Sequence, residues 1–176
     1  DFALFVNAES FNQDLSGWDV TNVTNMGIMF EGATAFNQDI GGWNVSSVTN
    51  MGQMLNGATS FNQNLGVWDI SSVTDMTNML SNTSISVNNY DAILNGWATL
   101  DGGETVIPAN VNLGASGLTY STVGSTNRSN LITNGWTITG DQTEGTEAFV
   151  YILRTATPNE SVNVPIVGAG YNYSVE

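Results

Sequence analysis

The sequence FNQDLSGWDVTNVTNMGIMFEGATA, which spans residues 11–35, returns twice in the chain with a constant period of 25 residues. The second copy, FNQDIGGWNVSSVTNMGQMLNGATS, spans 36–60, and the third, FNQNLGVWDISSVTDMTNMLSNTSI, spans 61–85. Residues 1–10 match the tail of a further copy. A fixed period of this length indicates a repeat architecture, because one short unit cannot bury its apolar residues alone and neighbouring units bury them together.

The apolar positions inside each copy predict the shape of one unit. In 15–20, Leu15, Trp18 and Val20 alternate closely enough with other residues to predict a short strand that pairs with the same strand of the next copy. In 23–30 the apolar residues lie three or four apart, which is the spacing of a helical or 3₁₀ turn. The predicted fold class is therefore a right-handed, leucine-rich-repeat-like solenoid, with a short strand and a short helical turn in each 25-residue coil.

The regular pattern fades beyond the third copy, and the remaining sequence predicts a cap and a second module. Residues 81–140 include a short helix with Gly96 in the C′ position and later strand-like runs, which we interpret as irregular coils that close the solenoid of 1–80. Residues 141–147 are polar and predict a linker. Three strand-like runs in 148–176 predict the start of a β-sandwich-like module.

The charge of the chain is one-sided, with 16 Asp and Glu against two Arg and no Lys, for a net charge of −14. Nucleic acids and anionic membranes attract proteins through Lys and Arg, so we expect no nucleic-acid partner. We also expect no direct membrane insertion, because the chain has no apolar run of the length that a spanning helix needs.

The residue types also argue against catalysis. The chain has no Cys and no His, which excludes thiolate and imidazole metal sites and the usual nucleophilic triads. A carboxylate pair, Asp101 and Glu104 around Gly102-Gly103, is the candidate for general acid–base work. Two carboxylates beside glycines are more typical of a solvated turn, so we expect no enzyme activity.

Polar residues recur at fixed positions as well. Asn12-Gln13 and its equivalents are predicted to bond backbone groups at each corner. The rows that begin at Asp14 and Asp19 could bind calcium weakly, but each row includes an Asn, which favours a structural role. We therefore expect no resident cofactor and no transition metal, and weak calcium binding stays open. The predicted binding face consists of residues expected to point outward from the strands: Ser16, Asp19, Gly41, Asn44, Gly66 and Asp69.

The repeated pattern FNQ-(D/N)-(L/I)-x-x-W-(D/N)-(V/I)-(S/T)-x-V-T-(N/D)-M-x-x-M-(F/L), at 11–30, 36–55 and 61–80, resembles the BspA-like leucine-rich repeats of bacterial surface proteins. The Asn-Gly-Trp segments at 95–97 and 134–136 are similar to the closure of such repeats, and 149–176 is similar to the start of a PKD or immunoglobulin-like module. The resemblance implies extracellular display at the cell surface and adhesion or protein binding. In Bacteroidetes it also implies a link to type IX export or gliding motility. It carries over no catalytic residue.

Two functions of different classes stay open on the sequence. The first is a bacterial cell-surface adhesion or interaction segment of a larger exported protein, which binds an extracellular glycan or protein surface through a multivalent face. The second is a passive spacer in a surface filament, which contacts only neighbouring modules of the same polypeptide. A glycan-active enzyme is a third and weaker reading.

Overall fold

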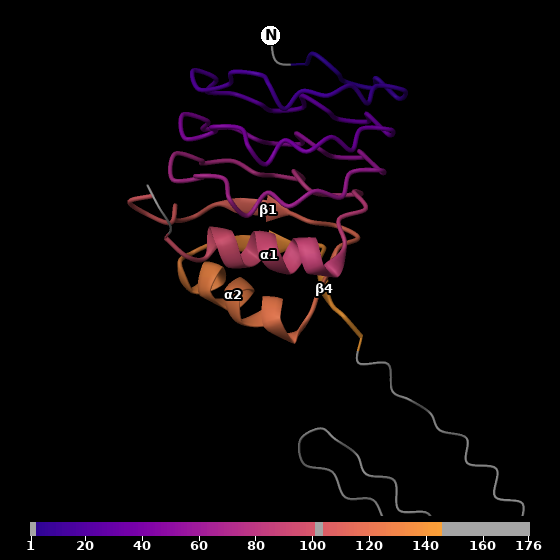
Figure 1. The fold of residues 1–176 in the computed structure, drawn as a ribbon. Coiled ribbons are helices and arrows are strands. Elements are labelled where there is room, and N and C mark those ends of the chain that lie inside the picture. Colours follow the sequence, from indigo (N-terminus) through magenta and orange to yellow (C-terminus); the bar gives the residue numbers. More distant parts are fainter. Residues whose placement is uncertain (1–2, 101–103, 146–176) are drawn as a thin grey trace, which may run out of the picture. The chain divides into compact units, whose positions relative to one another are not determined.

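The structure is a computed structural model that describes residues 3–100 and 104–145 (Figure 1). Residues Asp1–Glu144 form one compact unit and Gly145–Glu176 a second. The predicted β-sandwich-like module at 148–176 lies outside the described residues, as do the last two residues of the predicted linker at 141–147.

The three sequence repeats lie beside one another in register, so the period of the sequence is also the period of the contacts. Parallel bridges link Asn25 to Asn50 and Asn50 to Asp75. The phenylalanine that opens each copy stacks on its equivalent, with ring centroids 6.1 Å apart for Phe11 and Phe36 and 5.9 Å apart for Phe36 and Phe61. Residues 25 positions apart are therefore neighbours across the interface between two copies.

Inside each copy the backbone advances by a succession of turns. In the first copy the N–H of Trp18 bonds the carbonyl of Leu15, and the N–H of Val23 bonds that of Val20. The same three-residue step joins Met29 to Met26. Each step returns the chain so that the next apolar side chain also faces inward. Non-glycine residues in the left-handed region interrupt any helix, as at Ile28, with φ 58°, and Gln53, with φ 57°.

The predicted fold class, a leucine-rich-repeat-like solenoid with a strand and a helical turn in each coil, is wrong. The described part of the chain has two helices and two small sheets of two short parallel strands each, all between residues 87 and 143, which makes it a small mixed α/β arrangement. No strand forms at 15–20 and no helix at 23–30 in the described residues, where the chain makes turns and single bridges. The apolar spacing of three reflects successive turns, each closed by a bond from residue i+3 to residue i, and helical periodicity gives the same spacing.

The regular elements follow the repeats. Helix α1, Val87–Trp97, begins at Ser86, whose side chain accepts a hydrogen bond from the N–H of Asn89. Helix α2, Thr122–Thr133, begins in the same way at Ser121, which accepts from the N–H of Val123. The predicted helix before Gly96 is confirmed, although α1 continues through Gly96 to Trp97.

The short strands connect this part to the repeats. Strand β1, Asn112–Gly114, pairs with β3, Thr137–Thr139, and β2, Thr119–Tyr120, pairs with β4, Gln142–Thr143. Both pairs are parallel, with α2 as the crossover, which is the connection that parallel strands need. A further bridge joins Leu113 to Met76 in the third repeat, so β1 continues the contacts of the repeats.

One hydrophobic core runs from the repeats into the helical end. It contains the aligned aromatic and aliphatic residues of the copies together with Tyr90, Ile93 and Leu94 of α1 and Leu131 of α2. In Figure 1 the two helices lie at the end of the molecule opposite the N-terminus. The helical end therefore covers the last repeat.

Candidate interaction surface

A polar groove of about 550 Å³ crosses the repeats. Three of its lining residues, Asn25, Asn50 and Asp75, occupy equivalent positions in the three copies, and we call them the rail residues. Gly27 and Gly52 also line the groove. The lining is completed by Ala3, Ile28, Gln53 and Thr77. The groove therefore presents a polar side chain at each of three successive repeats, an amide twice and a carboxylate once, and parallel bridges join Asn25 to Asn50 and Asn50 to Asp75.

Local turns position the three rail residues. The Oδ1 of Asn25 accepts the N–H of Gly27 at 2.8 Å, and Asn50 accepts that of Gly52 at the same distance. Asp75 accepts the N–H of Thr77 at 2.9 Å. One oxygen of each side chain therefore fixes its orientation. The second polar atom, an amide NH₂ or a carboxylate oxygen, is the group that each rail residue can offer to a ligand.

The glycine in the middle of the groove keeps it open. A Cβ on Gly52 would lie 2.9 Å from Oδ2 of Asp75, which is closer than real Cβ atoms approach. A Cβ on Gly27 would lie 3.3 Å from Oδ1 of Asn50. Larger residues at these positions would therefore displace the rail side chains.

The binding face predicted from the sequence is only partly on the surface. Asp19 and Asn44 are exposed and Asp69 is half-buried, and each accepts the N–H of the residue two positions later, namely Thr21, Ser46 and Ser71. Of the other residues, Ser16 is exposed, Gly41 is half-buried and Gly66 is buried. The prediction is wrong for Gly66, because the backbone of α1 packs against it at Ala92 and Gly96.

Two exposed carboxylates of the first copy, Asp14 and Asp19, are held charged by their own turns. The pKa of Asp14 is lowered from its usual value, first by the hydrogen bond from the backbone of Ser16. The pKa of Asp19 is also lowered, first by the hydroxyl of Thr21 and then by its backbone N–H. Both groups are fully exposed, so these hydrogen bonds act in water and the carboxylates remain accessible.

The sequence reading missed the groove. Its signal was present, because Asn25, Asn50 and Asp75 recur in step, and the first two stand two residues before a glycine. They lie in the segments, beginning with 23–30, for which the apolar spacing predicted a helical or 3₁₀ turn. Since the chain turns here instead, these residues line a groove with the glycine backbone beside them.

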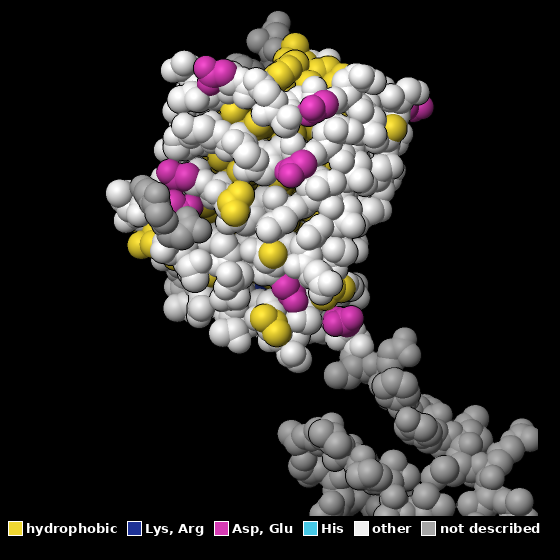
Figure 2. Space-filling view, viewed as in Figure 1, with side chains coloured by type: hydrophobic (Ala, Val, Ile, Leu, Met, Phe, Trp, Pro, Cys, Tyr) yellow, Lys and Arg dark blue, Asp and Glu magenta, His cyan; other side chains and the backbone are white. Residues whose placement is uncertain are grey.

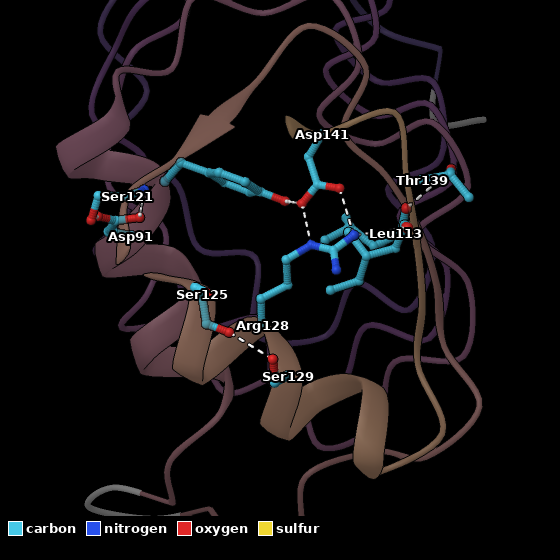
Figure 3. Close-up of polar contacts among 10 residues, drawn as sticks. Asp91, Leu113, Ser121, Ser125, Arg128, Ser129, Thr139 and Asp141 are labelled. Atoms are coloured by element: carbon cyan, nitrogen blue, oxygen red, sulfur yellow. Dashed lines mark hydrogen bonds and ion pairs between the residues drawn. The ribbon is translucent and has the colours of Figure 1, made fainter. Parts of the chain in front are cut away.

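A second polar cluster lies at the helical end, where Arg128 of α2 holds Asp141 (Figure 3). The Nε of Arg128 lies 2.7 Å from Oδ2 of Asp141, and its second nitrogen lies 2.8 Å from Oδ1. The hydroxyl of Tyr90 in α1 donates to the same Oδ2 at 2.9 Å. Burial, and then the charge of Asp141, raises the pKa of Tyr90, so its hydroxyl remains a donor. The cluster ties α1 and α2 to the residue before β4, and its polar atoms are engaged with one another, so we assign it a structural role.

Metal and membrane sites find no support in the described part of the chain. No group of three or more Asp and Glu that could hold a metal ion occurs among its residues. Of the carboxylate pair considered for catalysis, Asp101 lies outside the described residues and Glu104 is half-buried. Neither described helix has the length and apolar character needed to cross a membrane.

The repeats and the first helix together match a known family. The profile described as "Mycoplasma protein of unknown function, DUF285" covers residues 2–97, which is more than half of the 176 residues. The chain belongs to the DUF285 family. The match ends at Trp97, the last residue of α1, so the DUF285 region comprises the repeats and the helix that covers the last of them. Searches of curated proteins and of solved structures gave no match.

Proposed function

We propose that this chain is an adhesion or interaction segment of a bacterial cell-surface protein, of the BspA-like kind, and that it binds a neutral, hydroxyl-rich polymer, a glycan, outside the cell. The observation that carries the proposal is the groove in which Asn25, Asn50 and Asp75 place a polar side chain at the equivalent position of three successive copies. A polymer with a short repeat of its own can make one contact with each copy. Several weak contacts on one scaffold then give an affinity that no single contact has.

The chemistry of the groove favours sugar hydroxyls over charged ligands. The amides of Asn25 and Asn50 can donate to and accept from sugar hydroxyls, the carboxylate of Asp75 can accept from them, and no Lys exists in the chain to attract a polyanion. Arg128 already holds Asp141, and its guanidinium lies 5.1 Å from the ring centre of Tyr120. In the view of Figure 2 acidic side chains are spread over the surface. An anionic glycan or a nucleic acid would therefore be repelled.

A passive spacer remains the second candidate, and one observation favours it. Asp19, Asn44 and Asp69 all use an oxygen to close a local turn, which gives them a structural purpose without any ligand. A rigid, soluble stalk needs no more than that. The two functions differ in whether blocking the groove changes binding to surfaces.

The test is a screen of the chain on an array of neutral glycans, with Thr77→Tyr as the blocking variant. Thr77 is exposed and lines the groove, so a tyrosine there should obstruct it without disturbing the core. Thr126→Tyr is the matched control, because Thr126 is exposed on α2, outside the groove lining. We expect Thr77→Tyr to lose most of the array signal and Thr126→Tyr to retain it.

The row proposed from the sequence is tested in parallel by Asp19→Ser, Asn44→Ser and Asp69→Ser together. Serine can still accept a hydrogen bond in a local turn, so the variant should fold. If neither this variant nor Thr77→Tyr changes binding to glycans or to cells, the adhesive function fails and the spacer stands. Binding that resists every glycan but responds to a protein surface would instead identify a protein partner.

A further inference from the structure

One position of the groove differs in chemistry between copies that share the same backbone. Ile28, Gln53 and Asn78 occupy equivalent places in the three repeats, and all have a left-handed backbone, with φ of 58°, 57° and 54°. The residue that follows each of them does not change, since it is methionine in every copy. Ile28 and Gln53 both line the groove. The first copy therefore offers an apolar side chain where the second offers an amide.

Isoleucine is the residue least suited to this backbone. A left-handed φ is uncommon for residues other than Gly, Asn and Asp, and a β-branched residue is an outlier there. The third copy shows that asparagine, which tolerates this conformation, fits the position. Two backbone bonds hold Ile28 in place, because its N–H donates to the carbonyl of Gly52 at 2.9 Å and its carbonyl accepts the N–H of Glu31 at 3.1 Å. Backbone strain that the surrounding structure maintains in this way is typical of functional sites.

Packing in the core does not account for the isoleucine. Ile28 is half-buried and, in the described part of the chain, belongs neither to the core nor to the partly buried apolar residues packed against it. The next two residues, Met29 and Phe30, fill the core at 5% and 0% exposure. The position also has chain on both sides, since the N–H of Phe5 bonds the carbonyl of Met29 and the N–H of Ile28 bonds that of Gly52. The strained apolar side chain is therefore available to a ligand in the groove.

An amide lies beside this apolar side chain. Asn25 lines the groove in the same copy, and of the two residues between it and Ile28, Met26 is buried in the core and Gly27 has no side chain. Oδ1 of Asn25 accepts the N–H of Gly27 at 2.8 Å and keeps a second lone pair, and the NH₂ group carries two donors. An apolar contact next to an amide that both donates and accepts is complementary to an acetamido group, which consists of a methyl, a carbonyl and an N–H.

We propose that the first copy's part of the groove is a subsite for the acetamido group of an N-acetylhexosamine. This inference rests on the proposed function and narrows its ligand class from neutral glycans to neutral glycans that carry N-acetylated sugars. The methyl group lies against Ile28, and the amide of Asn25 pairs with the acetamido N–H and carbonyl. A hydroxyl in place of the acetamido group would leave Ile28 in contact with water. Gln53 and Thr77, which line the groove at the later copies, bind the hydroxyls of the sugars that follow.

The test compares two neutral, β-1,4-linked trisaccharides, cellotriose and tri-N-acetylchitotriose. They differ only at carbon 2 of each sugar, where the first has a hydroxyl and the second an acetamido group. Calorimetric titration gives the Kd of each. We expect the acetylated trisaccharide to bind about tenfold more tightly, which is the lower end of the range for an added apolar group. We also expect a nuclear Overhauser effect between the acetyl methyl protons and the δ1 methyl of Ile28.

Three variants identify the residues that read the acetamido group. Ile28→Asn introduces the residue of the third copy, so it should fold, and we expect the preference to fall to about twofold or less. Asn25→Asp keeps the turn, as Asp75 does, but removes the NH₂ donors, so we expect it to weaken binding of the acetylated trisaccharide more than binding of cellotriose. Ile132→Asn is the matched control, because Ile132 is 44% exposed on α2, outside the groove lining, and the preference should be unchanged.

The outcomes separate this inference from the proposed function. Equal binding of the two trisaccharides overturns the acetamido subsite and leaves a glycan-binding groove standing. A preference that survives in Ile28→Asn also overturns the subsite, because Ile28 then does not contact the methyl group. If Ile28→Asn does not fold, the Overhauser effect in the parent decides, and its absence at saturation overturns the subsite. If neither trisaccharide binds, the subsite is overturned and the proposed function depends on the glycan array alone.

Discussion

The indole Nε1 of Trp97 donates a hydrogen bond of 3.0 Å to the backbone carbonyl of Leu65. Trp43 and Trp68 make the same bond to Leu15 and Ile40, although they lie in turns and Trp97 lies at the end of a helix. The donor and the acceptor are 32 residues apart in the sequence at Trp97 and 28 residues apart at Trp43, because α1 replaces the turns of a fourth copy. The helix therefore closes the repeats by making the contacts that a further repeat would make.

We expect Trp97→Phe to destabilise the chain by about 1–3 kcal/mol, because the buried carbonyl of Leu65 loses its donor and the smaller ring leaves space. Trp18→Phe is the control, since Trp18 is 43% exposed and Trp97 is 1% exposed. Urea unfolding followed by circular dichroism measures both. Equal losses of stability in the two variants would contradict the conclusion that the hydrogen bond of Trp97 helps to close the repeats.

The sequence predicted the period and the stacking partners but not the backbone between them. Identical residues at a spacing of 25 must occupy equivalent environments, so the alignment of Phe11 with Phe36 could be derived without a structure. The local conformation could not, because apolar residues three apart suit both a helix and a series of turns. The left-handed residue at Ile28 decides for turns, and a β-branched side chain is the last residue that propensity would place there.

The candidate surface, too, could be predicted only in part from the sequence. The residues expected to point outward from the predicted strands included Gly66 along with Asp19 and Asn44, and this was the basis of the predicted face. The expectation held for the exposure of Asp19 and Asn44. It failed at Gly66 because α1, a segment distant in sequence, packs on that residue. The groove at Asn50 was not predicted because it depends on the turn geometry and on the glycines beside it.

Ile28 offers a direct test of backbone strain. Its φ is 58°, in a region that costs an ordinary L-residue roughly 1–2 kcal/mol, whereas Asn tolerates it. We expect Ile28→Asn to raise the free energy of unfolding by about 0.5–1 kcal/mol. The reverse change in the next copy, Gln53→Ile at φ 57°, should lower it. Chemical denaturation of both variants measures the effect, and a loss of stability in Ile28→Asn would show that side-chain packing outweighs the strain.

The turns at Asp14 and Asp19 predict how stability responds to acid. Both pKa values lie below the usual 3.8 in the folded chain, so their contribution is present above that pH and is lost as the pH falls through the lower folded values. The other copies show a substitute that does not titrate, because Asn64 and Asn44 close the same turns.

We therefore expect the double variant Asp14→Asn, Asp19→Asn to match the parent at pH 7 and to lose less stability between pH 4 and pH 2. Thermal melts across this range measure the difference. Identical acid profiles for the parent and the double variant would assign the acid response to other carboxylates.

Gly96 is the position where local propensity and packing disagree most. It lies inside α1, where replacing glycine by alanine normally stabilises a helix by about 0.8–1 kcal/mol. A Cβ on Gly96, however, would lie 2.7 Å from the Cα of Gly66 and still closer to its carbonyl group. Backbone cannot yield as a flexible side chain does, so α1 would have to move away from the third repeat and loosen the bond between Trp97 and Leu65.

We expect Gly96→Ala to destabilise the chain by about 1–3 kcal/mol, the usual range for overpacking. Gly17→Ala is the control, because a Cβ there meets nothing within 4 Å and should change stability by less than about 0.5 kcal/mol. Urea midpoints measure both variants, and a more stable Gly96→Ala would mean that α1 does not rest on Gly66.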